Sequence, residues 1–312
     1  ARSYLNLYKE FGETYLKKAL KSLKWLMDNY SRGYSGYCWG YPFDWMTKPF
    51  IPKGTPSIVV SCIAANAFLD AYEILRAEEY LNVAKSTCNF LLDDLNVDAI
   101  DEDIICFSYT PLDHSHVHNA NLFGASLLAR VYKHTKIEEY RKLAEKAVKF
   151  TTLYQNSDGS WYYRAPLDKY RARMYIDNYH TGFILESLYV IREVLKDEFL
   201  YDENLEKGIE FYRDHLFVKE TIPKFTPRLL YPIDIHDVAQ GIITFSRLQK
   251  LNPQYGKIAE KMAKWAITNM QDEDGYFYHR VYRHRIDKTP YVRWGQAWML
   301  TALSTLGGTY HE

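Results

Sequence analysis

The chain has 312 residues, and its 39 lysines and arginines balance its 39 aspartates and glutamates, so its net charge is zero. This balance argues against a nucleic-acid binder that neutralises phosphates and against a polybasic membrane-surface protein. The longest nearly apolar stretch, residues 58–69, contains Ser61, Cys62 and Asn66 and is shorter than the roughly 18 residues of a bilayer span. We therefore expect a globular protein with no membrane span and no nucleic-acid partner.

Two kinds of helical segment alternate along the chain. The first kind is amphipathic, with apolar residues at helical spacing and charges on the opposite face, and it is predicted at residues 11–29, 77–95, 137–155, 203–216 and 255–270. The second kind is apolar on nearly all sides and follows each of these segments after a loop. A small residue near the start of each apolar helix repeats at intervals of 59, 58, 59 and 56 residues, at Ala65, Gly124, Gly182, Gly241 and Ala297.

This alternation predicts an all-α fold with two concentric layers. A helix without a polar face must be enclosed, so the apolar helices form an inner ring and the amphipathic helices surround it. The predicted fold class is an α/α toroid, or barrel, in which five helical hairpins are visible in the sequence. The whole chain, residues 1–312, is interpreted as one domain.

The loops that lead into the apolar helices also repeat. Residues 158–164 (DGSWYYR) match residues 274–280 (DGYFYHR), where Asp-Gly favours a turn with positive φ and the aromatic residues after it favour a short strand. The opposite connections, at residues 75–78, 133–138 and 250–254, are short. We therefore expect long aromatic loops at one end of the toroid, and binding at that end.

Aromatic residues are abundant: 28 Tyr, 15 Phe and 7 Trp. Tyrosine in this number cannot all be buried without partners for its hydroxyl groups. Many rings must line a surface that is apolar in the body and polar at the edge, as in sugar-binding clefts and protein interfaces.

With its hairpin period, its Asp-Gly-aromatic loops and the closing segment 293–298 (RWGQAW), the chain resembles the α/α-toroid enzymes of carbohydrate metabolism. These are the six-hairpin glycosidases, the unsaturated glucuronyl hydrolases, the sugar epimerases and the toroid polysaccharide lyases. The resemblance covers the whole chain and implies five to six hairpins and an oligo- or polysaccharide substrate.

Aspartates and histidines gather just before the apolar helices, where a ring would bring them to one rim. Asp113, Asp177 and Asp234 also suit helix N-caps, and Thr55 suits a cap that is followed by proline at the first helical position. His114, His116 and His118 alternate, but no carboxylate in register completes a zinc site. We expect no metal and no cofactor.

The leading hypothesis is a glycoside hydrolase, which needs one carboxylic acid to protonate the leaving oxygen and a second carboxylate to activate water or attack. Asp177 and Asp234 are the first candidates, with His180 and His236 beside them and Asp44 and Asp237 in reserve. The candidate substrate-binding residues are Trp39, Trp45, His118, Asn119, Trp161, Asn178, Tyr278, His279, Arg293, Trp294 and Gln296.

Two alternatives stay open. A polysaccharide lyase or uronyl C5-epimerase would use a neutral His or Tyr as base and Asn or Arg to offset the developing charge, and the candidates are His180, His118, Tyr278, Asn119 and Arg293. A non-catalytic toroid that binds a glycan or a protein is the other alternative. Nothing in the sequence specifies an oligomeric state.

The four cysteines, Cys38, Cys62, Cys88 and Cys106, have no metal-binding spacing, and no secretion signal is visible at the start of the chain. Free thiols in a reducing compartment are the simplest interpretation, so the sequence favours a cytoplasmic location.

Overall fold

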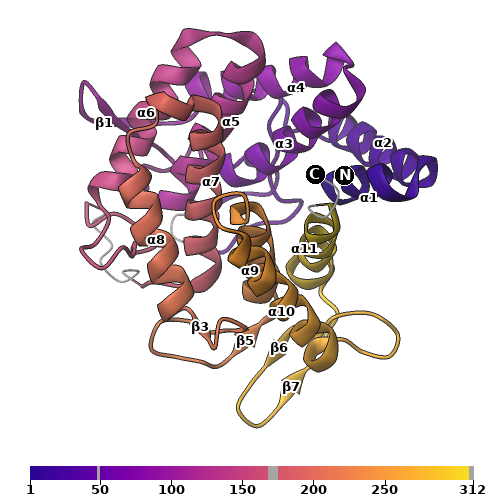
Figure 1. Ribbon diagram of the computed structural model, residues 1–312. Helices are drawn as coiled ribbons and strands as arrows, with labels where there is room; N and C mark the ends of the chain where they lie inside the picture. The colour runs from indigo at the N-terminus through magenta and orange to yellow at the C-terminus, as the bar shows by residue number, and fades with distance from the viewer. Residues whose placement is uncertain (48–49, 168–174, 309–312) are drawn as a thin grey trace.

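The computed structural model describes residues 1–47, 50–167 and 175–308 (Figure 1). In these residues, helices surround a central lumen in two layers, which confirms the predicted α/α toroid. The inner helices are α1 (Arg2–Phe11), α3 (Ile58–Leu75), α5 (His118–Thr135), α7 (Asn178–Leu195), α9 (Ile235–Leu248) and α11 (Ala297–Gly308). The outer helices are α2 (Glu13–Asp28), α4 (Glu78–Asn89), α6 (Glu138–Leu153), α8 (Asp202–His215) and α10 (Pro253–Met270).

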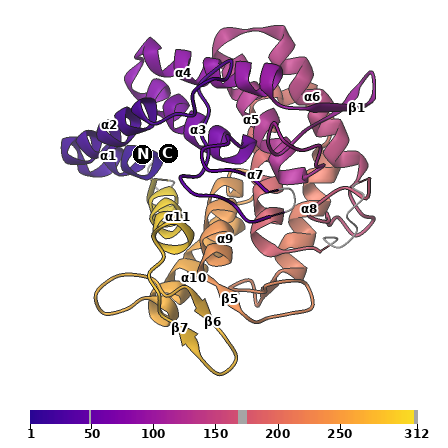
Figure 2. The ribbon, with the colours of Figure 1, turned by 180° about the vertical axis from the view of Figure 1, so that it is seen from behind.

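Each inner helix packs against the next, and α11 packs against α1, which closes the ring. Helices α1 and α11 lie side by side in Figure 1 and in the reverse view of Figure 2. Helix α9 shows why the inner layer is apolar: all of its residues except Arg247 are buried. Within the described part of the chain, one helix, α3, is long and apolar enough to cross a membrane by length and composition, and here half of it is buried as a wall of the ring.

The structure corrects the number of inner helices. The sequence analysis identified five, because it assigned residues 1–10 to no helix. Gly12 ends α1 and precedes α2 with φ of 80°, in the left-handed region that glycine adopts without steric cost. Among the described residues the ring therefore has six inner helices, and α1 joins α3 to α11.

The connections differ at the two ends of the toroid, as the sequence predicts. The inner helices α3 and α5 end at Arg76 and Lys136, both in the left-handed conformation, and an outer helix begins two residues later. The outer helices instead lead into long loops. Three small antiparallel sheets lie in these loops: β1 (Val97–Asp101) with β2 (Ile104–Phe107), β3 (Phe217–Val218) with β4 (Ile222–Pro223), and β5 (Ile233–Asp234) with β6 (Arg280–Val281) and β7 (Ile286–Asp287).

Short irregular helices complete the chain path: the π-helical turns η1 (Phe90–Asp94) and η4 (Val292–Gln296) and the 3₁₀ turn η3 (Lys196–Glu198). The predicted Asp-Gly turns are confirmed, because Gly159 and Gly275 have φ of 87° and 89°. The four cysteines are free and buried, and burial raises the pKa of Cys38 to about 12.

Helix capping follows the prediction in two of four cases. Asp177 caps α7 and Asp234 caps α9, each accepting a hydrogen bond from a backbone N–H of the first turn. The predictions for Thr55 and Asp113 are wrong. Ser57 caps α3, and Asp113 instead closes a turn by accepting hydrogen bonds from the N–H groups of Thr110 and Ser115.

Candidate active site

The lumen widens into a cavity of about 580 Å³ at the end where the inner helices begin. We call this space the mouth cavity. The first turns of α5, α7 and α9 contribute polar residues to its wall, and η4 together with the loop before α3 contributes aromatic rings and an arginine. The mouth residues used below are Tyr41, Phe43, Trp45, Tyr109, Asn119, Phe123, Tyr163, Tyr175, Tyr179, His180, Phe183, His236, Arg293, Trp294 and Trp298.

His180 lies in this wall and is partly exposed to the cavity. Its Nδ1 lies 2.6 Å from Oδ2 of Asp177, and Asp177 also accepts the backbone N–H of His180 as the cap of α7. A carboxylate at Nδ1 favours the tautomer in which Nδ1 donates its proton and Nε2 keeps its lone pair. Since the side chain of His180 is 16% exposed and that of Asp177 only 6%, the carboxylate orients the imidazole from behind the cavity wall.

His236 belongs to the same wall but is enclosed by rings. Tyr179 stacks on one side at 4.5 Å between ring centroids, and Trp298 stacks at 4.6 Å. Both ring nitrogens of His236 are buried without a hydrogen-bond partner among the described residues. Burial, reinforced by the charges of His180 and Arg293, lowers the pKa of His236 to about 3, so it is a neutral imidazole at physiological pH.

Three aspartates lie behind these histidines, and each has different hydrogen-bond partners. Asp177 pairs with His180, and Asp234 accepts a hydrogen bond of 2.7 Å from Nε of Arg280. Asp237 accepts only the N–H of Tyr179, and its second oxygen is buried without a partner among the described residues. Burial, with the nearby charges of Asp234 and Asp177, raises the pKa of Asp237 well above its usual range.

Asn119 and Arg293 add polar groups to the mouth. Asn119 is 3% exposed, and its side-chain oxygen is buried without a partner in the described part of the chain. The guanidinium of Arg293 lies over the rings of Tyr41 and Trp294, 4.6 and 4.4 Å from their centroids. Stacking on rings fixes the plane of a guanidinium and leaves its N–H groups for a ligand.

Of the residues proposed from the sequence, six line the mouth cavity: Trp45, Asn119, His180, His236, Arg293 and Trp294. Asp177, Asp234 and Asp237 support the wall from behind. Asp44 lies outside it, exposed, and accepts the backbone N–H of Lys53.

The remaining proposed residues do not line the mouth cavity and instead pack inside the protein or bind other protein groups. Trp39 and Trp161 are 3% and 1% exposed and donate their indole N–H groups to the carbonyls of Leu26 and Thr151, so these two candidate substrate-binding residues pack inside the protein and do not line the mouth cavity. His118 is fully buried and packs against Phe150.

Four others bind protein groups instead of lining the mouth. Asn178 donates to the carbonyl of Leu216, and Gln296 exchanges hydrogen bonds with the backbone of Phe277. The hydroxyl of Tyr278 donates to Asp272, and His279 Nδ1 lies 3.0 Å from Asp287.

Two of the three alternating histidines, His114 and His116, meet at one carboxylate, and His118 lies apart from them. His114 and His116 both contact Asp98, at 2.9 and 3.0 Å, while His118 points into the core. No group of three or more metal-binding side chains gathers anywhere within residues 1–47, 50–167 and 175–308.

Sequence reasoning missed most of the aromatic wall. Tyr41, Tyr109, Tyr179, Phe183 and Trp298 line the mouth and were not proposed. A signal was available in α7, because Tyr179, Phe183 and Glu186 follow the i, i+4, i+7 spacing of one helix face and all three line the lumen. The high tyrosine content predicted such a surface in general but did not locate it.

No protein-family model matches the chain, and no curated protein matches its sequence. Solved structures do match its fold. The cellobiose 2-epimerase from Bacillus thermoamylovorans is 15% identical with a TM-score of 0.70, over 95% of this chain and 85% of that one. A D-mannose isomerase is 13% identical with a TM-score of 0.69, over 99% and 83% of the two chains. The unsaturated glucuronyl hydrolase from a Bacillus species, responsible for the degradation of glycosaminoglycan, is 14% identical with a TM-score of 0.68, over 98% and 85%.

These proteins are all α/α-toroid carbohydrate enzymes, so the resemblance inferred from the sequence is confirmed at the level of the fold. At 13 to 15% identity they define the architecture of this chain and leave its reaction to be argued from the mouth cavity.

Proposed function

We propose that this protein is a carbohydrate enzyme that removes the proton from the carbon beside a carbonyl or carboxyl group of a sugar residue. Sugar epimerases, sugar isomerases and polysaccharide lyases share this step. The proposal prefers the histidine-based alternative of the sequence analysis to the leading hydrolase hypothesis.

The observation that carries this proposal is the chemistry of the mouth wall. Two imidazoles, His180 and His236, line the cavity. Among the described residues, the one carboxylate that lines it is Glu186, which lies a further turn and a half along α7 and is ion-paired with Arg247. A hydrolase needs two carboxyl groups flanking the scissile bond. Asp177 is paired with His180 and Asp234 with Arg280, so the described part of the chain presents no pair of free carboxylates to the cavity.

In the proposed reaction, Nε2 of His180 accepts the proton as the C–H bond breaks. The bonding electrons move toward the carbonyl oxygen and give an enediolate or enolate, whose negative charge the guanidinium of Arg293 offsets. Delivery of a proton to the opposite face of the same carbon gives an epimer, and delivery to the neighbouring carbon gives an isomer. Loss of a β-oxygen substituent, which leaves with a proton as an alcohol, gives a lyase product.

The aromatic residues suit a sugar ligand. Tyr163 and Tyr175 are stacked at 5.4 Å between centroids, and Tyr41 and Phe43 at 5.2 Å, and all four residues line the cavity, so it contains both flat apolar rings and tyrosine hydroxyl groups. Pyranose rings present C–H groups on their faces and hydroxyls at their edges, which matches such a surface.

A panel of reducing sugars and uronate-containing oligosaccharides tests the proposal. Epimers or ketoses detected by chromatography, or ultraviolet absorbance from an unsaturated product, would support it. New reducing ends without either signal would instead support the hydrolase. His180→Asn should lower turnover by about a thousandfold, because it removes the base.

His279→Asn is the matched control. His279 contacts Asp287 at 3.0 Å in the same way that His180 contacts Asp177, but His279 lies outside the mouth cavity. We expect this variant to keep its activity within about twofold of the parent protein. Equal losses in both variants would contradict the role of His180.

A further inference from the structure

The lumen continues past the mouth cavity into the depth of the ring. A second space of about 220 Å³ follows, and a third of about 530 Å³ lies toward the opposite end. Arg2 and Arg247 line the mouth cavity and both of these spaces, so their side chains mark the point at which the three spaces meet. We call Arg2, Arg247 and their acidic partners Asp70 and Glu186 the waist.

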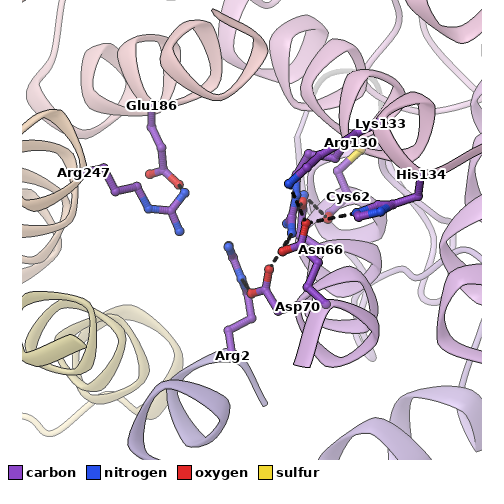
Figure 3. Close-up of polar contacts among 10 residues, drawn as sticks. Arg2, Cys62, Asn66, Asp70, Arg130, Lys133, His134, Glu186 and Arg247 are labelled. Carbon is purple, nitrogen blue, oxygen red and sulfur yellow. Dashed lines mark hydrogen bonds and ion pairs between the residues drawn. The ribbon is translucent and has the colours of Figure 1, made fainter. Parts of the chain in front are cut away.

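The waist lies well below the proposed reaction centre. Arg247 follows His236 by eleven residues on the same helix, α9, which corresponds to roughly 16 Å along the helix axis at 1.5 Å per residue. Figure 3 shows the guanidinium groups of Arg2 and Arg247 pointing from α1 and α9 into the open space that the inner helices enclose. A group bound between them would not displace a sugar residue at His180.

The hydrogen-bond partners of the waist are incomplete. Arg2 uses Nε to bind Asp70 at 2.6 Å, and Arg247 uses one terminal nitrogen to contact Glu186 at 2.7 Å. A guanidinium has five N–H donors, so each of these arginines retains several toward the lumen. Their side chains keep 24% and 23% of their surface exposed.

Arg130 shows what a saturated arginine looks like in the same lumen. It binds Asn66 at 2.7 Å and both Asp70 and Glu73 at 2.9 Å, and only 11% of its side chain is exposed (Figure 3). Arg130 therefore ties α5 to α3. Arg2 and Arg247 have fewer contacts than Arg130. They keep N–H donors that an arginine with a purely structural role would use to bind protein groups.

Charged side chains line the second space. Arg2, Arg130 and Arg247 lie there with two carboxylates, Asp70 and Glu186, and Glu73 pairs with Arg130 from outside the space. Burial lowers the pKa of Arg247, and the positive charge of Arg2 lowers it further against the effect of Glu186. Two like charges that share a desolvated space repel each other, and an anion between them removes this repulsion.

We propose that Arg2 and Arg247 form a binding site for a carboxylate or phosphate group at the waist of the lumen. Forked guanidiniums suit these planar or tetrahedral anions because they can donate two parallel hydrogen bonds to them. The anion is either a free small ion or the acidic end of an oligosaccharide whose other end lies in the mouth cavity.

Inorganic phosphate is the probe, measured by isothermal titration calorimetry on the full chain without any sugar. We expect saturable binding that weakens as sodium chloride is added, and Arg247→Gln should weaken it by about tenfold. Arg283→Gln, which removes the same charge from an exposed position between β6 and β7, should bind phosphate like the parent. Absence of saturable binding to the parent, or equal binding by the two variants, would overturn the proposal.

Glu186→Gln provides a test in the opposite direction. It removes the anion that competes for Arg247, so phosphate binding should tighten by about threefold or more. A merely structural ion pair predicts lower stability and no gain in affinity. A gain would keep the proposal intact even if Arg247→Gln folded poorly, and no gain would overturn it.

Competition separates the two sources of the anion. If a uronate-terminated oligosaccharide displaces phosphate and the neutral oligosaccharide of equal length does not, the acidic end of the substrate occupies the waist. If neither displaces phosphate, a free anion occupies it. Because phosphate binding is measured without catalysis, its failure would leave the proton-transfer proposal standing.

Discussion

The mouth cavity and the waist are built from the same six helices but treat their polar groups in different ways. At the mouth, His236 and the oxygen of Asn119 are buried without partners among the described residues. At the waist, Asp70 is bound by both Arg2 and Arg130, and Glu186 is bound by Arg247. A buried polar group without a partner costs stability, so its presence in a cavity wall indicates a ligand or a reaction.

The paired charges at the waist have a different effect. Burial would raise the pKa of Asp70, but Arg2 and Arg130 together hold it well below its usual range. Asp70 therefore stays ionised and links α3 to α1 and α5. The comparison suggests that stability is concentrated at the waist and reactivity at the mouth, and four substitutions can test this division.

Arg130→Ala should have the largest effect on stability. It removes a guanidinium that contacts Asp70 and Glu73 and leaves these carboxylates partly unpaired inside the lumen. We expect the free energy of unfolding to fall by about 3 kcal/mol in urea denaturation. Activity per folded molecule should be unchanged, and a loss of activity without a loss of stability would break the division between the two regions.

Asp177→Asn should have the largest effect on activity among the supporting residues. The amide can still cap α7, but its NH₂ group cannot accept the proton of His180 Nδ1, which disturbs the tautomer of the imidazole. We expect turnover to fall by about a hundredfold while the free energy of unfolding changes by about 1 kcal/mol or less. Retained turnover would reduce Asp177 to a helix cap.

His236→Gln should change how stability depends on pH. The folded protein keeps His236 neutral down to a pKa of about 3, whereas the unfolded chain takes up a proton near pH 6.5. The unfolded state therefore binds more protons between these values, and the parent should lose about 2 kcal/mol between about pH 7 and pH 5 from this residue. Urea titrations should show a smaller loss in the variant, and equal slopes would contradict a neutral buried His236.

Asp237→Asn should have the smallest effect and the opposite sign. Because the pKa of Asp237 is raised in the folded protein, the folded state prefers the protonated acid. The free energy of unfolding therefore decreases as the pH rises above the pKa that Asp237 has in the unfolded chain. A neutral amide avoids this cost, and we expect a gain of about 1 kcal/mol in thermal or urea unfolding at pH 8. Loss of activity with no change in stability would instead assign Asp237 a catalytic role and favour the hydrolase.

Much of the architecture could be predicted because it depends on periodicity. The alternation of amphipathic and apolar segments predicts the two layers, and the Asp-Gly turns predict the end with long loops. Helix α1 was missed because the sequence analysis predicted no helix before residue 11, whereas α1 covers Arg2–Phe11 and ends at Gly12. The aspartates and histidines at the starts of α7 and α9 were located correctly, because a ring places helix N-termini at one rim.

The direction of individual side chains could not be predicted in the same way. Asn178 and Tyr179 are adjacent, yet Asn178 is buried against Leu216 and Tyr179 lines the mouth. Trp161 follows a predicted turn but fills the core beneath it. Such outcomes depend on contacts between distant segments, which the local pattern does not contain.

The charged residues of the waist could have been found from the sequence. Glu186 and Arg247 are charges within helices that are otherwise nearly apolar, and such a charge requires a partner or a cavity. Their helical spacing from Tyr179 and Ile243 places them on the face that lines the lumen.

Deuterium incorporation tests the central claim most directly. A sugar that the protein converts is incubated in heavy water, and the product is examined by mass spectrometry and proton NMR. Proton transfer at the mouth predicts solvent deuterium on the carbon beside the carbonyl or carboxyl group of an epimer or isomer, or, for a lyase, loss of that carbon's hydrogen with formation of a double bond. A cleaved product that has taken up oxygen from labelled water, with every carbon-bound hydrogen retained, would contradict it.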